Sequence, residues 1–200
     1  MPQLLSELCA QDEGYLCGRA FTGEVFAPDD LSRAEFRELS FTRCRFAGCD
    51  FSKASLTQVT FCECDLSSCR FPESFWKNCT MTNCKAEGIL LSDAVLRGCT
   101  FRQCSFAYAN CASSRWENCL LEECVFQEAF LTECRLLKTR LADCDLRKAD
   151  FFKTSLKGLD LSSCSLGGIA VSDTLAELKG AKIGAEQALD LIGLLGVKLV

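Results

Sequence analysis

The feature that most constrains this chain is a five-residue period that keeps its register over most of the sequence. In residues 39–71 one position of every five is large and apolar, as in Phe41 and Phe46, and the residue two places before it is small or moderately apolar. We call the large position the centre and the small position the niche. From Phe21 to Val171 the centres fall at every residue number that ends in 1 or 6, and the niches at numbers that end in 4 or 9.

A period of five matches neither the 3.6-residue turn of a helix nor the two-residue alternation of a strand. A fixed period over most of a chain indicates a repeat architecture, in which each unit buries its apolar face against its neighbours. Every twentieth niche between residues 44 and 164 is a cysteine, and one column of centres alternates Trp76, Leu96, Trp116 and Leu136. Columns of distinct character predict stacked rungs of twenty residues.

This pattern resembles the pentapeptide-repeat family, whose motif is small, polar, Leu or Phe, polar, variable. The resemblance covers roughly residues 14–178. It implies an all-β solenoid, a right-handed quadrilateral parallel β-helix of about eight coils in which four units form the four sides of each coil. We expect residues 1–13 to cap the first coil, with Leu4, Leu5 and Leu8 over its open end.

Residues 179–200 leave the repeat, and we interpret them as a C-terminal capping and dimerisation module. Residues 184–196 predict a helix of about ten residues with its acids early and Gly196 as its stop, and residues 197–200 predict a short strand-like end. An end cap alone is the alternative, but exposed apolar patches usually mark association. The expected dimer interface comprises Ala188, Leu189, Leu191, Ile192, Leu195 and Val197.

The composition suits one compact unit of 200 residues with 48% hydrophobic content and a net charge of −5. No apolar run reaches membrane-span length, and the N-terminus lacks the features of a signal peptide, so we expect a cytoplasmic protein. The 17 cysteines are interpreted as small buried hydrophobes, because rungs about 4.8 Å apart with parallel Cβ vectors do not suit disulfides. With no histidine, we expect no metal site and no cofactor. Cys62 breaks the niche rule and is expected to point outward.

Any functional residues are expected at the outer positions, because the side chains of centres and niches face the core. The side that contains residues 29–33, 49–53 and their equivalents has eight acidic and four basic residues, a net charge of −4. The next side has a net charge of +3, in a count that includes Glu177. The expected partner-binding acidic side comprises Asp29, Asp30, Asp50, Glu73, Asp93, Glu133, Asp150 and Asp173.

The geometry favours binding to a DNA-binding protein, although a mixed charged surface is also what any soluble rod presents. Eight rungs would span roughly 38 Å, and two rods joined end to end roughly 75–80 Å. DNA rises about 3.4 Å per base pair, so such a dimer has the length of more than about twenty base pairs. We expect no direct nucleic-acid binding, since the net charge is −5 and the basic side lacks a dense cluster.

Three segments resemble the Qnr-type quinolone-resistance proteins: residues 21–24 near the start, residues 84–88 where the centre is Ala86, and the tail from Gln187 to Val197. The resemblance implies a homodimer that binds DNA gyrase or topoisomerase IV and protects it from fluoroquinolones or natural toxins. Many Qnr proteins carry two projecting loops, which this unbroken register lacks. A structural scaffold with another protein partner is the alternative. We expect no catalytic residues, because the acids lie on a convex surface and the thiols lie in the core.

Overall fold

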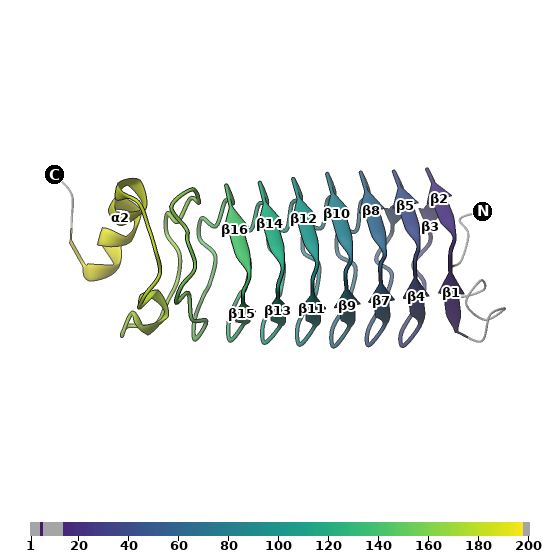
Figure 1. The fold of residues 1–200 in the computed structure, drawn as a ribbon, viewed down its shortest axis with the longest axis horizontal. Coiled ribbons are helices and arrows are strands. Elements are labelled where there is room, and N and C mark those ends of the chain that lie inside the picture. The colour runs from purple at the N-terminus through teal and green to yellow at the C-terminus, as the bar shows by residue number, and fades with distance from the viewer. Residues whose placement is uncertain (1–4, 6–13, 198–200) are drawn as a thin grey trace.

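The computed structural model describes residues 5 and 14–197, and in these residues the chain forms a straight rod of stacked coils (Figure 1). Each coil has four sides, which we call walls 1 to 4 in chain order. Strand β1 lies near one end of the rod and helix α2 at the other (Figure 1). The predicted all-β parallel solenoid with a short C-terminal helix is therefore confirmed.

Walls 1 and 2 are regular parallel sheets. Wall 1 is formed by β1 (Tyr15–Cys17), β4 (Glu35–Arg37), β7 (Ser55–Thr57), β9 (Phe75–Lys77), β11 (Val95–Arg97), β13 (Arg115–Glu117) and β15 (Arg135–Leu137). Wall 2 is formed by β2 (Ala20–Thr22), β5 (Ser40–Thr42), β8 (Thr60–Cys62), β10 (Thr80–Thr82), β12 (Thr100–Arg102), β14 (Leu120–Glu122) and β16 (Arg140–Ala142).

Walls 3 and 4 are held mainly by single β-bridges. Wall 3 begins with β3 (Val25–Phe26) and β6 (Arg45–Phe46) and continues as bridges to the pair Asp145↔Ser165. Wall 4 runs as bridges from Asp30↔Asp50 to Asp150↔Ala170. Each of the two long sheets has seven strands, so the expected count of about eight coils is slightly high by this measure, because the ladder past Ala142 continues only as bridges.

The twenty-residue register is confirmed in all four walls as far as Ala170, and beyond it the bridge Asp160↔Lys182 has a spacing of 22. Trp76 pairs with Leu96 and Leu96 with Trp116, as the alternating column predicts. The niche cysteines also align, because the backbone N–H of Cys44 donates to Cys64 Sγ at 3.4 Å and that of Cys64 donates to Cys84 Sγ at 3.4 Å. Side chains twenty positions apart therefore lie directly above one another along the rod.

The core is a single continuous column of centres and niches. Phenylalanine rings stack between rungs, for example Phe51 on Phe71 with their centroids 4.4 Å apart. The three weak centres, Met81, Ala86 and Cys111, are as buried as the aromatic ones. This continuous burial means that each coil depends on its neighbours for its apolar contacts.

The corners of the coil use left-handed backbone at the second residue after a centre. Lys53 has φ 61° and Glu73 has φ 55°, a region that is unfavourable for residues other than glycine. The cost is offset by hydrogen bonds to the next rung, such as Glu73 N–H to the Ser92 carbonyl at 2.9 Å. These corners place polar side chains in columns along the edges of the rod.

The C-terminal cap consists of η1 (Ala176–Leu178), α2 (Ala185–Ile192) and η2 (Gly193–Leu195). Gly196 ends η2 with φ 72°, in agreement with the predicted stop. Two side chains of α2 replace backbone groups of a further coil: Gln187 Nε2 donates to the Cys164 carbonyl at 3.0 Å, and Asp190 Oδ2 accepts from the Leu166 N–H at 3.2 Å. The helix therefore satisfies the open end of wall 3.

The predicted N-terminal cap lies almost entirely outside the described residues, as do Leu4 and Leu8. Leu5 is described and is fully buried in the core cluster. Most of the expected strand-like C-terminal end also lies outside the described residues, and Val197 is its one described residue.

Candidate interaction surfaces

The predicted acidic residues fall on wall 4 and along its edges. Asp30, Asp50 and Asp150 share one column of bridges, whereas Glu73, Asp93 and Glu133 occupy left-handed corner positions of a second column. Asp173 follows the last bridge of the wall. Asp29, Asp50 and Asp150 are half-buried, and the other five acids are exposed.

The bridge-column aspartates have a local backbone role that the sequence analysis missed. Asp30, Asp50 and Asp150 each accept a hydrogen bond at Oδ1 from the N–H two residues later, at 3.0, 2.9 and 2.9 Å. Asn110 makes the same contact with Ala112 at 3.1 Å. Side-chain and backbone hydrogen bonds from Ser32 lower the pKa of Asp30. These acids therefore stabilise the turn at the end of wall 4 as well as charging it.

Neighbouring rungs neutralise three of the eight acids. Arg70 Nε lies 3.3 Å from Asp50 Oδ2, Lys53 Nζ lies 3.4 Å from Glu73 Oε2, and Lys153 Nζ lies 3.0 Å from Glu133 Oε1. Each partner is twenty residues from its acid, so the pairs follow from the register. Asp30, Asp93, Asp150 and Asp173 form no ion pair with any described residue. Wall 4 is thus acidic in patches rather than as an unbroken stripe.

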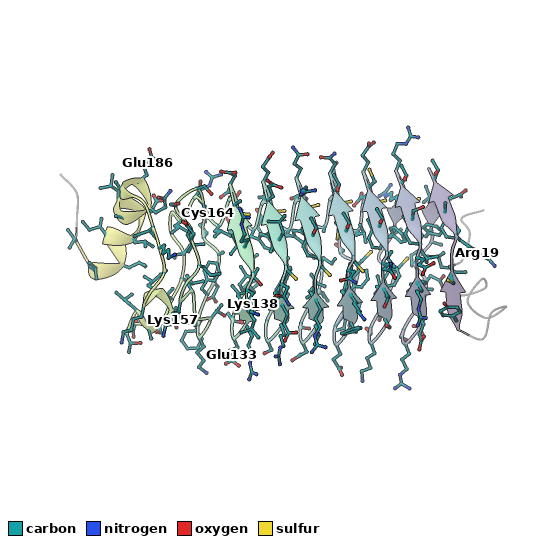
Figure 2. The ribbon with its side chains drawn as sticks, in the orientation of Figure 1. Arg19, Glu133, Lys138, Lys157, Cys164 and Glu186 are labelled. Atoms are coloured by element: carbon teal, nitrogen blue, oxygen red, sulfur yellow. The ribbon has the colours of Figure 1, made fainter. Side chains whose placement is uncertain are left out.

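Wall 1 is more basic than its sequence count suggests. Glu177, counted there as a surface charge, is only 4% exposed and belongs to the C-terminal cap, which corrects the sequence analysis. Glu117 is paired with Arg97 at 2.7 Å and with Arg115. Lys138 and Lys157 form no ion pair with a described residue, and both lie in the C-terminal half of the rod (Figure 2).

Four of the six expected dimer residues are exposed on the C-terminal cap. Leu189, Leu195 and Val197 are 58%, 65% and 47% exposed, and Ala188 is also exposed. Leu191 is half-buried and packs against the core cluster. An open apolar cavity of about 200 Å³ is lined by Leu175, Leu178, Ile183, Ala188, Leu191, Ile192 and Leu195.

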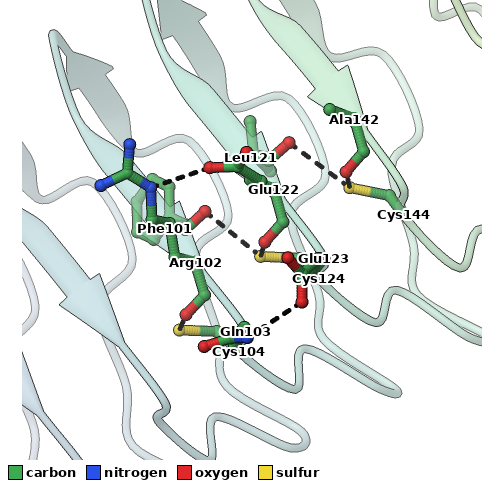
Figure 3. Close-up of polar contacts among 10 residues, drawn as sticks. All are labelled: Phe101, Arg102, Gln103, Cys104, Leu121, Glu122, Glu123, Cys124, Ala142 and Cys144. Atoms are coloured by element: carbon green, nitrogen blue, oxygen red, sulfur yellow. Dashed lines mark hydrogen bonds and ion pairs between the residues drawn. The ribbon is translucent and has the colours of Figure 1, made fainter. Parts of the chain in front are cut away.

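The niche thiols donate to carbonyl groups inside the rod. Cys124 Sγ donates to the Phe101 carbonyl at 3.5 Å, and Cys144 Sγ donates to the equivalent Leu121 carbonyl at 3.5 Å (Figure 3). Cys104 Sγ donates instead to the Arg102 carbonyl of its own rung, at 3.2 Å. Burial raises the pKa of Cys69 to about 12, whereas a hydrogen bond from Cys144 lowers the pKa of Cys164 to about 7. Cys164 is only 1% exposed, so solvent access limits its reactivity.

Among the described residues, the two most accessible thiols lie outside the niches. Cys17 is exposed, and Cys62 is half-buried on wall 2. No cysteine of the described residues takes part in a disulfide. Cys62 is therefore on the outside of the coil, as expected, but its side chain is less exposed than that of Cys17.

The described part of the chain offers little that resembles a catalytic or metal site. Within residues 5 and 14–197 no group of three or more His, Cys, Asp or Glu could hold a metal ion. A cavity of about 430 Å³ lies at the C-terminal end of wall 2, and its charged lining residues are Arg140 and Asp160. No described helix is long and apolar enough to cross a membrane.

Three exposed aromatic side chains near wall 4 were also missed. Tyr108, Phe130 and Phe152 are 56%, 52% and 43% exposed. Their signal in the sequence was an aromatic residue at a position that is neither a centre nor a niche.

Two family models match the coils. One, described as a pentapeptide repeat region, matches residues 54–131. The other, described as eight copies of pentapeptide repeats, matches residues 30–67 and 131–168. Together they span residues 30–168, which is more than half of the chain. A comparison with curated protein sequences finds no match.

Solved structures share the fold over most of the chain. Two structures of trypsin-treated QnrB1, described as a plasmid-mediated fluoroquinolone resistance protein, align with TM-scores of 0.56 and 0.55 at 23% identity. Both alignments cover 93% of this chain, and they cover 98% and 97% of those chains. HetL of the cyanobacterium Nostoc sp. strain PCC 7120, described as involved in heterocyst differentiation regulation, aligns with a TM-score of 0.43 at 19% identity over 84% of this chain and 86% of its own.

Proposed function

Because this chain belongs to the pentapeptide-repeat family, whose coils present only their outer walls to partners, we propose that it is a non-catalytic protein that protects a type II topoisomerase. The partner would be DNA gyrase or topoisomerase IV, and the protection would be against fluoroquinolones or natural topoisomerase toxins. The chain would act in the cytoplasm and bind the enzyme rather than nucleic acid. The fold shared with the fluoroquinolone resistance protein QnrB1 supports the proposal.

The observation that carries the proposal is the acidic surplus of wall 4. This wall keeps a net charge of −4 on a rod whose core has no open interior. Acids in patches along a straight rod fit the basic groove in which a topoisomerase holds DNA, because complementary potentials steer association and set the orientation of the partners. The rod would occupy this groove without supplying a reacting group.

Reversing the corner acids of wall 4 tests this surface. We expect the variant Glu73→Lys/Asp93→Lys/Glu133→Lys to need about tenfold more protein for half-maximal relief of ciprofloxacin inhibition in a gyrase supercoiling assay. These three residues are chosen because they are not part of the aspartate turns, so the fold is expected to persist. Circular dichroism and thermal unfolding would check this point.

The matched control reverses Glu38, Glu63 and Glu123, which occupy left-handed corners on the other edges of the rod. This control changes the net charge by the same amount and should retain protection. Equal losses in the two triple variants would contradict a wall-specific contact. An absence of relief by the wild-type protein at several-fold molar excess would overturn the proposed function itself.

The exposed apolar surface of the C-terminal cap supports a homodimer within this proposal. Leu189 and Leu195 are more than half exposed beside an apolar cavity, and exposed apolar patches usually mark association. We expect light scattering to give the mass of two chains for the wild type and of one chain for Leu189→Glu/Leu195→Glu. Val25→Glu, at a 49% exposed apolar position in β3, is the control that should remain dimeric. A monomeric wild type would refute the dimer.

A structural scaffold with another protein partner is the second candidate. The observation that favours it is the local use of the acids: three of them form ion pairs with the next rung, and three accept turn hydrogen bonds. Acids with such local partners need no external basic surface. Recovery of a partner other than topoisomerase subunits by a wall 4-dependent pull-down would favour this candidate.

A further inference from the structure

The exposed aromatic residues near wall 4 lie on a diagonal line. Tyr108, Phe130 and Phe152 follow one another at steps of 22 residues, which in a twenty-residue register is one rung plus two positions along the wall. Tyr108 lies at the left-handed corner between walls 3 and 4, with φ 59°, whereas Phe130 lies in the bridge column of wall 4 and Phe152 in the turn that follows the Asp150 bridge. The rod therefore presents three aromatic side chains in succession on an otherwise polar and acidic surface.

Tyr108 and Phe130, the first two of these residues, line an open cavity of about 340 Å³ together with Glu128, Ala129, Lys148 and Asp150. Glu128 is one rung from both Tyr108 and Lys148, since these residues are spaced by twenty. In the adjacent column Phe130 bridges directly to Asp150. The two rings thus come from neighbouring rungs, with a carboxylate at the end of the cavity nearest the C-terminal cap.

The charges of this cavity leave one carboxylate uncompensated. Lys148 Nζ lies 3.1 Å from Glu128 Oε1, so these two charges neutralise each other. Asp150 Oδ1 accepts the Phe152 N–H at 2.9 Å, but no described cation forms an ion pair with Asp150. The cavity therefore has a local net charge of −1 and no described side chain to balance it.

Other outward-facing rings of the rod already hold cations. The Arg37 guanidinium lies 5.4 Å from the Tyr15 ring centroid, that of Arg97 lies 5.8 Å from Phe75, and Lys153 Nζ lies 5.2 Å from Phe152. Among the described residues no cation takes this position over Tyr108 or Phe130. These two rings are thus exposed aromatic faces beside an unpaired carboxylate.

We propose that this cavity binds an arginine side chain from a basic segment of a partner protein. A guanidinium stacks on aromatic faces and donates two parallel hydrogen bonds to a carboxylate, so Tyr108, Phe130 and Asp150 offer both kinds of contact at once. The cavity rejects phosphate by its negative charge, which favours a protein over nucleic acid. Only the identity of the partner rests on the proposed function. If that function holds, the basic segment belongs to the groove in which the topoisomerase binds DNA.

A peptide-binding experiment tests the cavity without the topoisomerase. The probe is a fluorescein-labelled nona-arginine peptide, measured by anisotropy at 0.15 M salt so that distant surface charges are screened. We expect at least a tenfold loss of affinity in Tyr108→Ser/Phe130→Ser. Asp150→Asn keeps an oxygen for the Phe152 N–H but removes the charge, and it should weaken binding at least threefold. Leu137→Ser, at a 45% exposed apolar position on wall 1, should bind like the wild type.

Unchanged affinity in the double variant, or a comparable loss in the Leu137→Ser control, would overturn the assignment of the cavity. Tighter binding of a labelled twelve-residue oligothymidine than of the peptide would overturn it in favour of base stacking. The gyrase assay then separates this inference from the proposed function. If the wild type and the double variant protect gyrase equally, the topoisomerase is not the partner of the cavity, and this part of the inference fails while the proposed function stands. If the wild type does not protect, the proposed function fails and the peptide measurement alone decides the cavity.

Discussion

Replacing Trp116 by alanine is expected to lower the free energy of unfolding of the rod by about 3–5 kcal/mol. The side chain is 1% exposed and lies between Leu96 and Leu136 in the column of wall 1. Its ring packs against Phe101 and Phe126, with centroids 5.5 and 6.4 Å away. A solenoid coil has no other layer that could collapse into the cavity left behind. Chemical denaturation followed by circular dichroism measures the loss.

The expected loss in Trp116→Ala also contains a polar part, because Trp116 Nε1 donates to Ser114 Oγ at 2.8 Å in the core. Ser114→Ala removes this acceptor and leaves the indole N–H unpaired, at a cost of about 1–3 kcal/mol. The double variant Trp116→Phe/Ser114→Ala removes both partners. We expect its loss of unfolding free energy to be smaller than the sum of the losses in Trp116→Phe and Ser114→Ala. Strict additivity would contradict the pairing. Trp76 and Ser74 repeat the same contact two rungs earlier, at 2.9 Å, and provide an independent copy of the test.

Removing the carboxylate of Glu177 is expected to cost about 3 kcal/mol or more, because hydrogen bonds to a charged group contribute about 1.5–3 kcal/mol each. Glu177 Oε1 accepts the Lys153 N–H at 2.8 Å, and Oε2 accepts the Ser172 hydroxyl at 2.8 Å. In earlier coils the N–H that corresponds to Lys153 bonds a carbonyl of the next rung, as Glu133 N–H does with Phe152 at 2.9 Å. Glu177→Ala thus exposes the last rung of wall 4, and thermal unfolding should begin at the C-terminal end.

Glu177→Gln is the control, because the amide keeps one acceptor oxygen and should lose less stability than alanine. The pH dependence gives a second readout. Burial raises the pKa of Glu177, but the hydrogen bonds that the carboxylate accepts outweigh it, and the pKa lies below the ordinary value of 4.5. The stabilisation is therefore complete above pH 4.5 and is lost as the pH falls through the lower folded-state pKa. A wild type and a Glu177→Gln variant with the same acid dependence would contradict this role.

Register explains why so much of the fold could be predicted from the residues alone. Each coil meets only its neighbours, so a fixed five-residue period determines which side chains face the core and which share a column. The same reasoning at a spacing of twenty could have found the Lys53–Glu73 and Glu133–Lys153 ion pairs. The Trp116–Ser114 contact could also have been expected, because both tryptophan centres, Trp76 and Trp116, follow a serine niche by two residues.

The aspartate turns and the aromatic cavity could not be derived from the five-residue period. The contact from Asp50 to the Ser52 N–H depends on the backbone angles of a corner, and the period does not specify these angles. The positions of Phe130 and Phe152, which are neither centres nor niches, could have indicated that both are exposed. Only the coil geometry shows that Tyr108 and Phe130 line one cavity with Asp150. The net charge of a wall likewise does not show which of its acids form ion pairs with a neighbouring rung.

The sequence by itself determined the solenoid, its twenty-residue register, the burial of the niche cysteines and the C-terminal helix, because these depend on periodic burial that local spacing records. The tertiary structure alone decided which wall 4 acids lack ion partners, that Glu177 closes the last coil, and that two rings and a carboxylate form one cavity. These features depend on side-chain direction at corners and at the end of the rod. There the repeat changes or stops, and spacing no longer specifies which groups meet.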